Sequence, residues 1–126
     1  MKILCASALT LLAAGTSSVG AQDLTGPQQN AVRSANSYLS FSGFSRQGLI
    51  DQLSSPAGDD YDVRDATVAV DSLSVDWYAQ AVRSAESYLD FSGFSCNGLI
   101  RQLSSPAGSK FTESEAAHGA QQAGAC

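Results

Sequence analysis

Few side chains in this sequence are of the types that catalyse reactions. His118 is the only histidine, and nothing near it in the sequence suggests a catalytic partner. The many serines fall mostly at predicted helix caps and turns, where their hydroxyls have structural roles. The sequence contains no G-x-S-x-G or H-E-x-x-H motif, no paired-cysteine metal site and no glycine-rich phosphate loop. We therefore expect a protein that is not an enzyme and that binds no cofactor.

A short run of carboxylates is the feature that most resembles a cation site. Asp59, Asp60, Asp62 and Asp65 are close in sequence, but the run lacks the glycine and the bidentate glutamate of a calcium loop. A solvated loop followed by a helix start is the favoured interpretation. One histidine and two cysteines outside the N-terminal segment also make a metal cluster unexpected.

The first 21 residues have the pattern of a secretory signal peptide. Lys2 is followed by a mostly apolar stretch over residues 3–14, which is too short to span a membrane. Residues 19–21 (VGA) fit a small-residue cleavage site, with cleavage before Gln22. No other stretch is long or apolar enough to be a transmembrane segment. We therefore expect an exported protein, either periplasmic or secreted.

The charge of the processed chain argues against nucleic acid as a partner. Without residues 1–21 the chain has six basic and twelve acidic residues, a net charge of −6. Helix–turn–helix geometry would allow Arg33, Arg46 and Arg64 to approach phosphates. Phosphate binding, however, is driven by an excess of lysine and arginine. An acidic, exported chain is therefore expected to bind no nucleic acid.

A block of 28 residues occurs twice in the chain, 50 positions apart. Residues 31–58 read AVRSANSYLSFSGFSRQGLIDQLSSPAG, and residues 81–108 read AVRSAESYLDFSGFSCNGLIRQLSSPAG. The two copies are identical at 23 of 28 positions. A repeat of this period corresponds to one supersecondary unit. We therefore divide the chain into a signal peptide (1–21), a first repeat (22–75) and a second repeat (76–126).

Apolar residues at helical spacing indicate three short helices in each repeat, and no segment alternates with the period of a strand. We predict an all-α protein built from two tandem three-helix, helix-turn-helix-like repeats. The predicted helix starts are Pro27, Ser45 and Asp62 in the first repeat and Asp76, Ser95 and Thr112 in the second.

Aromatic residues are predicted to fill the centre of each repeat, and Trp77 and Tyr78 to pack between the repeats. The six predicted core aromatics are Phe41, Phe44, Tyr61, Phe91, Phe94 and Phe111. The predicted buried stripe of the third helix consists of Val63, Ala66, Ala69, Val70 and Leu73.

A disulfide is predicted between Cys96 and Cys126, because both cysteines remain in a chain sent to an oxidising compartment. It would join the start of the second helix to the end of the third, in the repeat whose third helix has less apolar volume. Closing a loop of this length contributes roughly 3 kcal/mol. Arg46 and Asp76 stand at the equivalent positions of the first repeat.

The repeated wording AVRSAxSYLxFSGFSxxGLIxQL, followed by D/E-A-x-x-A-V-D, closely resembles the Ltp family of host cell surface-exposed lipoproteins. The resemblance covers residues 28–73 and 78–126, and its closing segment fits residues 65–71 better than residues 115–120. It implies helix-turn-helix-like repeats outside the cytoplasmic membrane and brings no catalytic residues.

The resemblance also implies a function. Phage and prophage members are associated with superinfection exclusion, in which DNA entry is blocked through binding of an injected phage component such as the tape-measure protein. An acidic chain would suit a basic protein partner. A lipoprotein has a cysteine at the cleavage point, but Ala21 and Gln22 stand there, so a soluble exported form is expected. The alternative is a general envelope or extracellular module that binds wall polymer or another protein.

Positions that differ between the two copies are candidates for a partner-binding surface, because the shared positions mostly serve the fold. The shared Arg33 and Arg83 are included because both are expected to be exposed. Ordinary solvated helix faces are the alternative interpretation, and the sequence does not indicate the oligomeric state. The candidates are Arg33, Asn36, Ser40, Gln47 and Asp51 in the first repeat and Arg83, Glu86, Asp90, Asn97 and Arg101 in the second.

Overall fold

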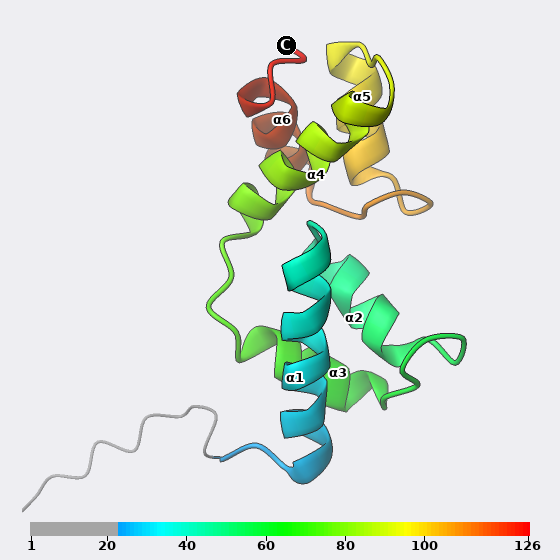
Figure 1. Cartoon of the computed structure of the whole chain (residues 1–126), viewed down its shortest axis with the longest axis vertical. Helices are drawn as coiled ribbons and strands as arrows, with labels where there is room; N and C mark the ends of the chain where they lie inside the picture. The colour runs from blue at the N-terminus through cyan, green and yellow to red at the C-terminus, as the bar shows by residue number, and fades with distance from the viewer. Residues whose placement is uncertain (1–22) are drawn as a thin grey trace, which may run out of the picture.

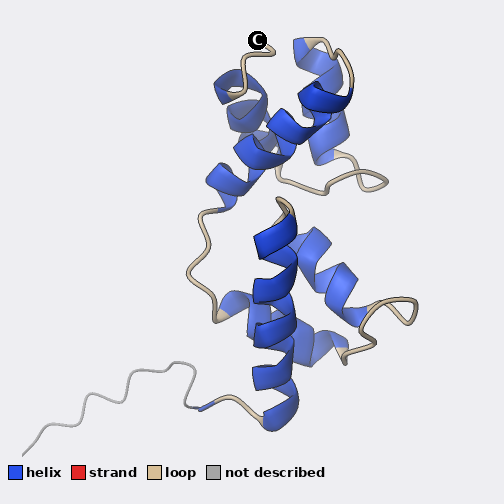
Figure 2. Cartoon of the chain, viewed as in Figure 1, coloured by secondary structure: helices blue, strands red, loops and turns tan. Residues whose placement is uncertain are grey.

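The computed structural model describes residues 23–126, which form six α-helices and contain no strand (Figures 1 and 2). The predicted all-α fold with two tandem three-helix repeats is confirmed, and the predicted signal peptide lies outside the described residues. None of the six helices combines the length and apolar character that crossing a membrane requires. The helices are α1 (Gly26–Phe41), α2 (Arg46–Ser54), α3 (Val63–Asp71), α4 (Trp77–Phe91), α5 (Cys96–Ser104) and α6 (Glu113–Gln122).

Each helix begins at a side chain that accepts a hydrogen bond from the first turn. The predicted caps of α2 to α6 all accept such a bond, and Thr112 and Glu115 form the predicted capping box. The start of α1 differs slightly from the prediction. The N-cap of α1 is Thr25, which forms a capping box with Gln28, so the helix begins just before Pro27. These local signals explain why six short helices form at these places.

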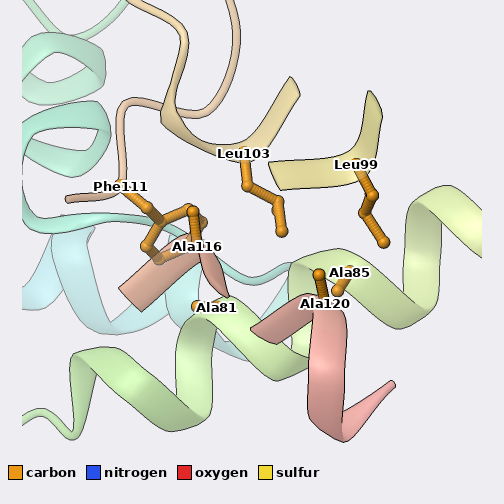
Figure 3. Packing of buried hydrophobic residues seen from close by; sticks show 7 residues of the cluster. All are labelled: Ala81, Ala85, Leu99, Leu103, Phe111, Ala116 and Ala120. Carbon is orange, nitrogen blue, oxygen red and sulfur yellow. The ribbon is translucent and has the colours of Figure 1, made fainter. Parts of the chain in front are cut away.

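Each repeat has its own hydrophobic core. Leucines from the middle helix of a repeat insert between alanines of the other two helices, as Leu99 and Leu103 do in the second repeat (Figure 3). The core of the first repeat consists of Ala35, Leu49, Ile50, Leu53, Ala66 and Val70. The core of the second consists of Ala81, Ala85, Leu99, Leu103, Phe111, Ala116 and Ala120.

Two of the six aromatics that were predicted to be buried are exposed, so the prediction was wrong for them. Phe41 is 87% exposed and Phe91 is 90% exposed. At 3.6 residues per turn, Phe41 lies about 100° from the middle of the buried stripe of α1, so its side chain points to solvent. Phe91 has the same position in α4. The remaining four are buried or partly buried, as predicted: Phe44, Tyr61, Phe94 and Phe111.

The third helices of the two repeats pack differently. Val63, predicted to be buried, is 61% exposed, because a side chain in the first turn leans beyond the N-terminal end of its helix. In the second repeat α6 lies very close to α4: a Cβ on Gly119 would be 2.7 Å from the Ala81 carbonyl oxygen. Smaller side chains in α6 are therefore accompanied by a closer approach of the helices.

The start of the middle helix is linked to the chain near the end of the third helix in both repeats, but by different interactions. The predicted disulfide between Cys96 and Cys126 is confirmed, and it ties the start of α5 to the C-terminal end of the chain. Arg46 stands where the second repeat has Cys96, but it pairs with Asp71 and not with Asp76. Its Nε and Nη2 atoms lie 2.6 and 2.8 Å from the two Asp71 carboxylate oxygens. The hydrogen bond from Arg46 lowers the pKa of Asp71.

Trp77 and Tyr78 lie at the junction of the repeats and pack to opposite sides. Trp77 packs against the core of the first repeat, although it is the first residue of α4. Tyr78 instead contacts α6: its hydroxyl is 3.2 Å from Ser114 Oγ, and its ring meets the His118 ring edge to face. The connection between the repeats is therefore anchored on the core of the first repeat and on α6 of the second.

Candidate functional site

The two repeats meet along a polar contact, which we call the seam. On one side of the seam lie the C-terminal end of α1, the turn after it and α2. On the other side lie α4 and the loop over residues 106–110, which reaches toward the first repeat (Figure 1). The two hydrophobic cores do not merge across the seam. Hydrogen bonds and one ion pair therefore set how the repeats sit against each other.

Arg83 makes the central contact of the seam. Its guanidinium donates hydrogen bonds to the carbonyl oxygens of Leu39 and Ser40, the latter at 3.3 Å. The last carbonyls of a helix have no partner within the helix, so a cation at this end is favourable. Arg83 was predicted to be exposed, but it is half-buried because it caps α1 from the neighbouring repeat.

Two further hydrogen bonds flank the arginine. The buried hydroxyl of Ser45, only 2% exposed, donates to the Ser109 carbonyl oxygen. The backbone N–H of Phe44 donates to Oε1 of Gln80 at 3.4 Å. Gly43 allows this close approach, because a Cβ there would lie 2.6 Å from Ser84 Oγ.

An ion pair between Asp51 and Lys110 closes the seam at its edge. The hydrogen bond from Lys110 lowers the pKa of the Asp51 carboxyl, and a second hydrogen bond from Gln47 Nε2, at 2.8 Å, acts in the same direction. Asp51 was proposed from the sequence as part of a partner-binding surface. The structure shows it half-buried and already paired.

The other candidate positions remain on the outer faces of four helices. Asn36 and Ser40 share a face of α1, and Glu86 and Asp90 share the equivalent face of α4, because residues four apart lie close on a helix surface. The structure does not bring all ten candidates together in one patch. The exposed candidates are Arg33, Asn36, Ser40 and Gln47 in the first repeat and Glu86, Asp90, Asn97 and Arg101 in the second.

The exposed phenylalanines are the surface feature that sequence reasoning missed. Each stands at the last position of the first helix of its repeat, so the molecule displays the same aromatic group twice. Phe91 also borders an open cavity of about 310 Å³, which Ser42 and Gly43 line from the first repeat. The helical register of the sequence contained the signal, because residue 41 falls outside the apolar stripe.

The two open cavities beside the seam are lined by glycines, serines and a few larger side chains. A second open cavity, of about 390 Å³, lies in the seam between Gln52 and Ser109, and its walls carry no histidine or cysteine. His118 contacts the Tyr78 ring, away from both cavities. Within residues 23–126, no three His, Cys, Asp or Glu side chains form a group that could hold a metal ion.

Comparison with known proteins agrees with this architecture. Residues 27–73 and 76–122 each match the model of a family described as host cell surface-exposed lipoprotein. Among solved structures, the chain is similar to Ltp, a superinfection exclusion protein from the Streptococcus thermophilus temperate phage TP-J34. The TM-score is 0.69 at 30% sequence identity, over 78% of this chain and 96% of that chain. A comparison with curated proteins found no match.

Proposed function

Because this chain belongs to the host cell surface-exposed lipoprotein family, we propose that it is an exported, non-enzymatic binding protein that acts in superinfection exclusion. The observation that carries the proposal is the tandem match of both repeats, together with a structural neighbour that is itself a superinfection exclusion protein. That similarity extends over almost the whole of the neighbour. It therefore includes the pairing of repeats and not a single helix-turn-helix unit.

The exposed phenylalanines are the best-placed anchors for a partner. Phe41 and Phe91 contribute nothing to either core, yet each presents a large apolar surface to solvent. Aromatic side chains are frequent among the few residues that dominate a protein interface. Polar residues flank each ring on its own helix and supply a hydrophilic rim.

The charge of the chain favours a basic protein as that partner. Residues 22–126 have a net charge of −6, and Asp59, Asp60 and Asp62 are exposed together in one loop. Opposite charge speeds the encounter of two proteins and helps to select among partners. A basic component that an incoming phage injects, such as its tape-measure protein, has the chemistry that this surface would attract.

Binding of such a component outside the cytoplasmic membrane would stop DNA entry without any chemical step. An injected protein held at the cell envelope cannot complete the passage for the DNA that follows it. This mode of action needs an exported chain with a durable fold and an exposed contact surface. The disulfide of the second repeat suits such a location, because disulfides persist in oxidising compartments.

A phage-sensitive host that exports this chain provides the test. We expect normal adsorption of susceptible phages but a loss of intracellular phage DNA, measured by quantitative amplification soon after infection. The double variant Phe41→Ser/Phe91→Ser should restore DNA entry while the protein remains folded and exported. Val63→Ser, at an exposed apolar residue far along the chain from both rings, is the matched control and should still exclude. Unchanged DNA entry across a broad phage panel would instead favour a general envelope-binding role.

A further inference from the structure

The seam joins two different faces, and each repeat carries a version of both. Face A, on the first repeat, is formed by Leu39, Ser40, Ser45 and Asp51. Face B, on the second repeat, is formed by Gln80, Arg83, Ser109 and Lys110. Within residues 23–126, face A of the second repeat and face B of the first repeat are left uncovered.

The uncovered faces keep most of the groups that make the seam. A shift of 50 positions places Leu89, Asp90, Ser95 and Arg101 on face A of the second repeat. The same shift places Asn30, Arg33, Asp59 and Asp60 on face B of the first. Ser95 is exposed where its counterpart Ser45 is buried, and Arg33 is exposed where Arg83 is half-buried. Both faces are therefore open to a partner that resembles a repeat of this chain.

Each uncovered face carries a charge opposite to that of its counterpart in the seam, so the two uncovered faces are again oppositely charged. Within the chain, Asp51 of face A pairs with Lys110 of face B. On the free faces, Arg101 replaces the aspartate and Asp60 replaces the lysine, and neither makes an ion pair among the described residues. We propose that copies of this chain associate head to tail, with Arg101 of one copy paired with Asp60 of the next.

The reversal also disfavours the wrong pairings. Face A of one first repeat against face B of another would bring Asp51 next to Asp60, and two second repeats would bring Arg101 next to Lys110. Like charges in contact oppose both arrangements. Only the alternating order, second repeat to first repeat, places opposite charges together at every seam.

The backbone of the free faces is already shaped for this contact. Asp60 and Lys110 share a left-handed conformation, with φ of 55° and 61°, so the loop presents its charged residue in the same way in both repeats. Gly93 corresponds to Gly43, which must be a glycine because the neighbouring repeat lies against it. No atom lies within 4 Å of a Cβ built on Gly93. A second copy could therefore lie as close to Gly93 as the second repeat lies to Gly43.

The association is expected to be weak and to extend in one direction. A contact between two different faces builds open chains or rings rather than a symmetric dimer. The contact between copies lacks the linker that joins the repeats, and Pro27 stands at the position that corresponds to Trp77, which packs against the first repeat. It must also offset the lost freedom of a separate molecule. Association should therefore rise with protein concentration and fall with salt.

Sedimentation equilibrium of the processed chain tests the proposal, which does not depend on the proposed function. The wild-type average mass should increase with concentration at low salt. Arg101→Asp and Asp60→Lys each introduce the residue that the other repeat carries at that position, so both should fold. Each should weaken association about tenfold, since attraction at the surface becomes repulsion. The double variant should restore it, because its charges reproduce those of the covalent seam.

Two further measurements make the result specific. An equal mixture of the two single variants should associate again in alternating order, because both mixed contacts join opposite charges while each variant alone joins like charges. Gly93→Ala should weaken association without lowering the thermal midpoint. A wild-type chain that stays monomeric at the highest attainable concentration would overturn the proposal. So would single variants that associate normally, or a double variant that does not recover.

Discussion

Arg46 and Asp71 form a two-pronged ion pair at the place in the first repeat where Cys96 and Cys126 form a disulfide in the second. Both links tie the start of a middle helix to the chain at the end of the third helix. A disulfide stabilises the fold by lowering the conformational entropy of the unfolded chain, whereas an exposed ion pair contributes little to stability. The two repeats should therefore respond differently when their links are removed.

Loss of the disulfide should loosen the second repeat first. Cys96→Ser opens a loop with a sequence separation of 30 residues, which should lower the stability of this repeat by about 3 kcal/mol. Hydrogen exchange should show α5 and α6 losing protection while α1 to α3 keep it. Asn97→Ser, at the next exposed position, serves as the control. An equal loss of protection in both repeats would contradict this expectation.

Acid should remove the ion pairs of the first repeat and the seam. Hydrogen bonds from Arg46 and Lys110 lower the pKa values of Asp71 and Asp51, respectively, below their ordinary value of 3.8. A lowered pKa means that the stabilisation is present above the ordinary pKa and is lost as the pH falls through the folded-state pKa. The effect should be under about 1 kcal/mol per pair, because both are partly exposed. Carboxyl titration by NMR should show both midpoints below 3.8, and Arg46→Ala should raise that of Asp71 alone.

Glycine matters in the first repeat but not at the equivalent place in the second. Gly43→Ala would bring a methyl group to 2.6 Å from Ser84 Oγ and 2.9 Å from the Gln80 carbonyl oxygen. The repeats must then separate, at a cost of about 1–3 kcal/mol. Gly93→Ala meets no neighbouring atom, so the thermal midpoint of the monomer should be unchanged or slightly raised. Equal effects of the two substitutions on thermal unfolding would show that the second repeat does not pack closely against Gly43.

Arg83 should control the relative position of the repeats, and Arg33 provides a matched control in the same chain. Arg83→Met removes the donors to the carbonyls of Leu39 and Ser40 but keeps an apolar side chain of similar length. We expect a wider distribution of distances between fluorophores placed on α2 and α5, with both cores intact. The loss of these charged hydrogen bonds should weaken the seam by about 1–2 kcal/mol. Arg33→Met should leave the distribution of the monomer unchanged.

Local signals in the sequence were sufficient for the helices and the disulfide. Ser45, Ser95 and Thr112 cap helices where their types and spacing indicated, because a cap depends only on the next few residues. The pairing of Cys96 with Cys126 followed from the compartment and the even count. Thr25 was missed although it stands three residues before Gln28, which is a capping-box spacing.

The seam could not be predicted, because it depends on how two separately folded units are placed. Nothing near Arg83 in the sequence distinguishes it from Arg33, since the residues around both are nearly identical. Only the structure shows one of them bound to the end of α1 and the other in solvent. Phe41 and Phe91 were misplaced for another reason. They were predicted to be buried because they are aromatic, although their angular position on the helix lies outside the apolar stripe.

The position of Trp77 has a practical consequence for anyone who wishes to excise one half of the molecule. It belongs by sequence to the second half, yet it shields apolar side chains of the first. Truncation at residue 75, the boundary that the duplication suggests, would remove Trp77 from the first half. Apolar side chains would then be exposed to solvent and prone to aggregation. A fragment that extends through residue 78 would keep Trp77 over its core, but the second half would then lose the first turn of α4.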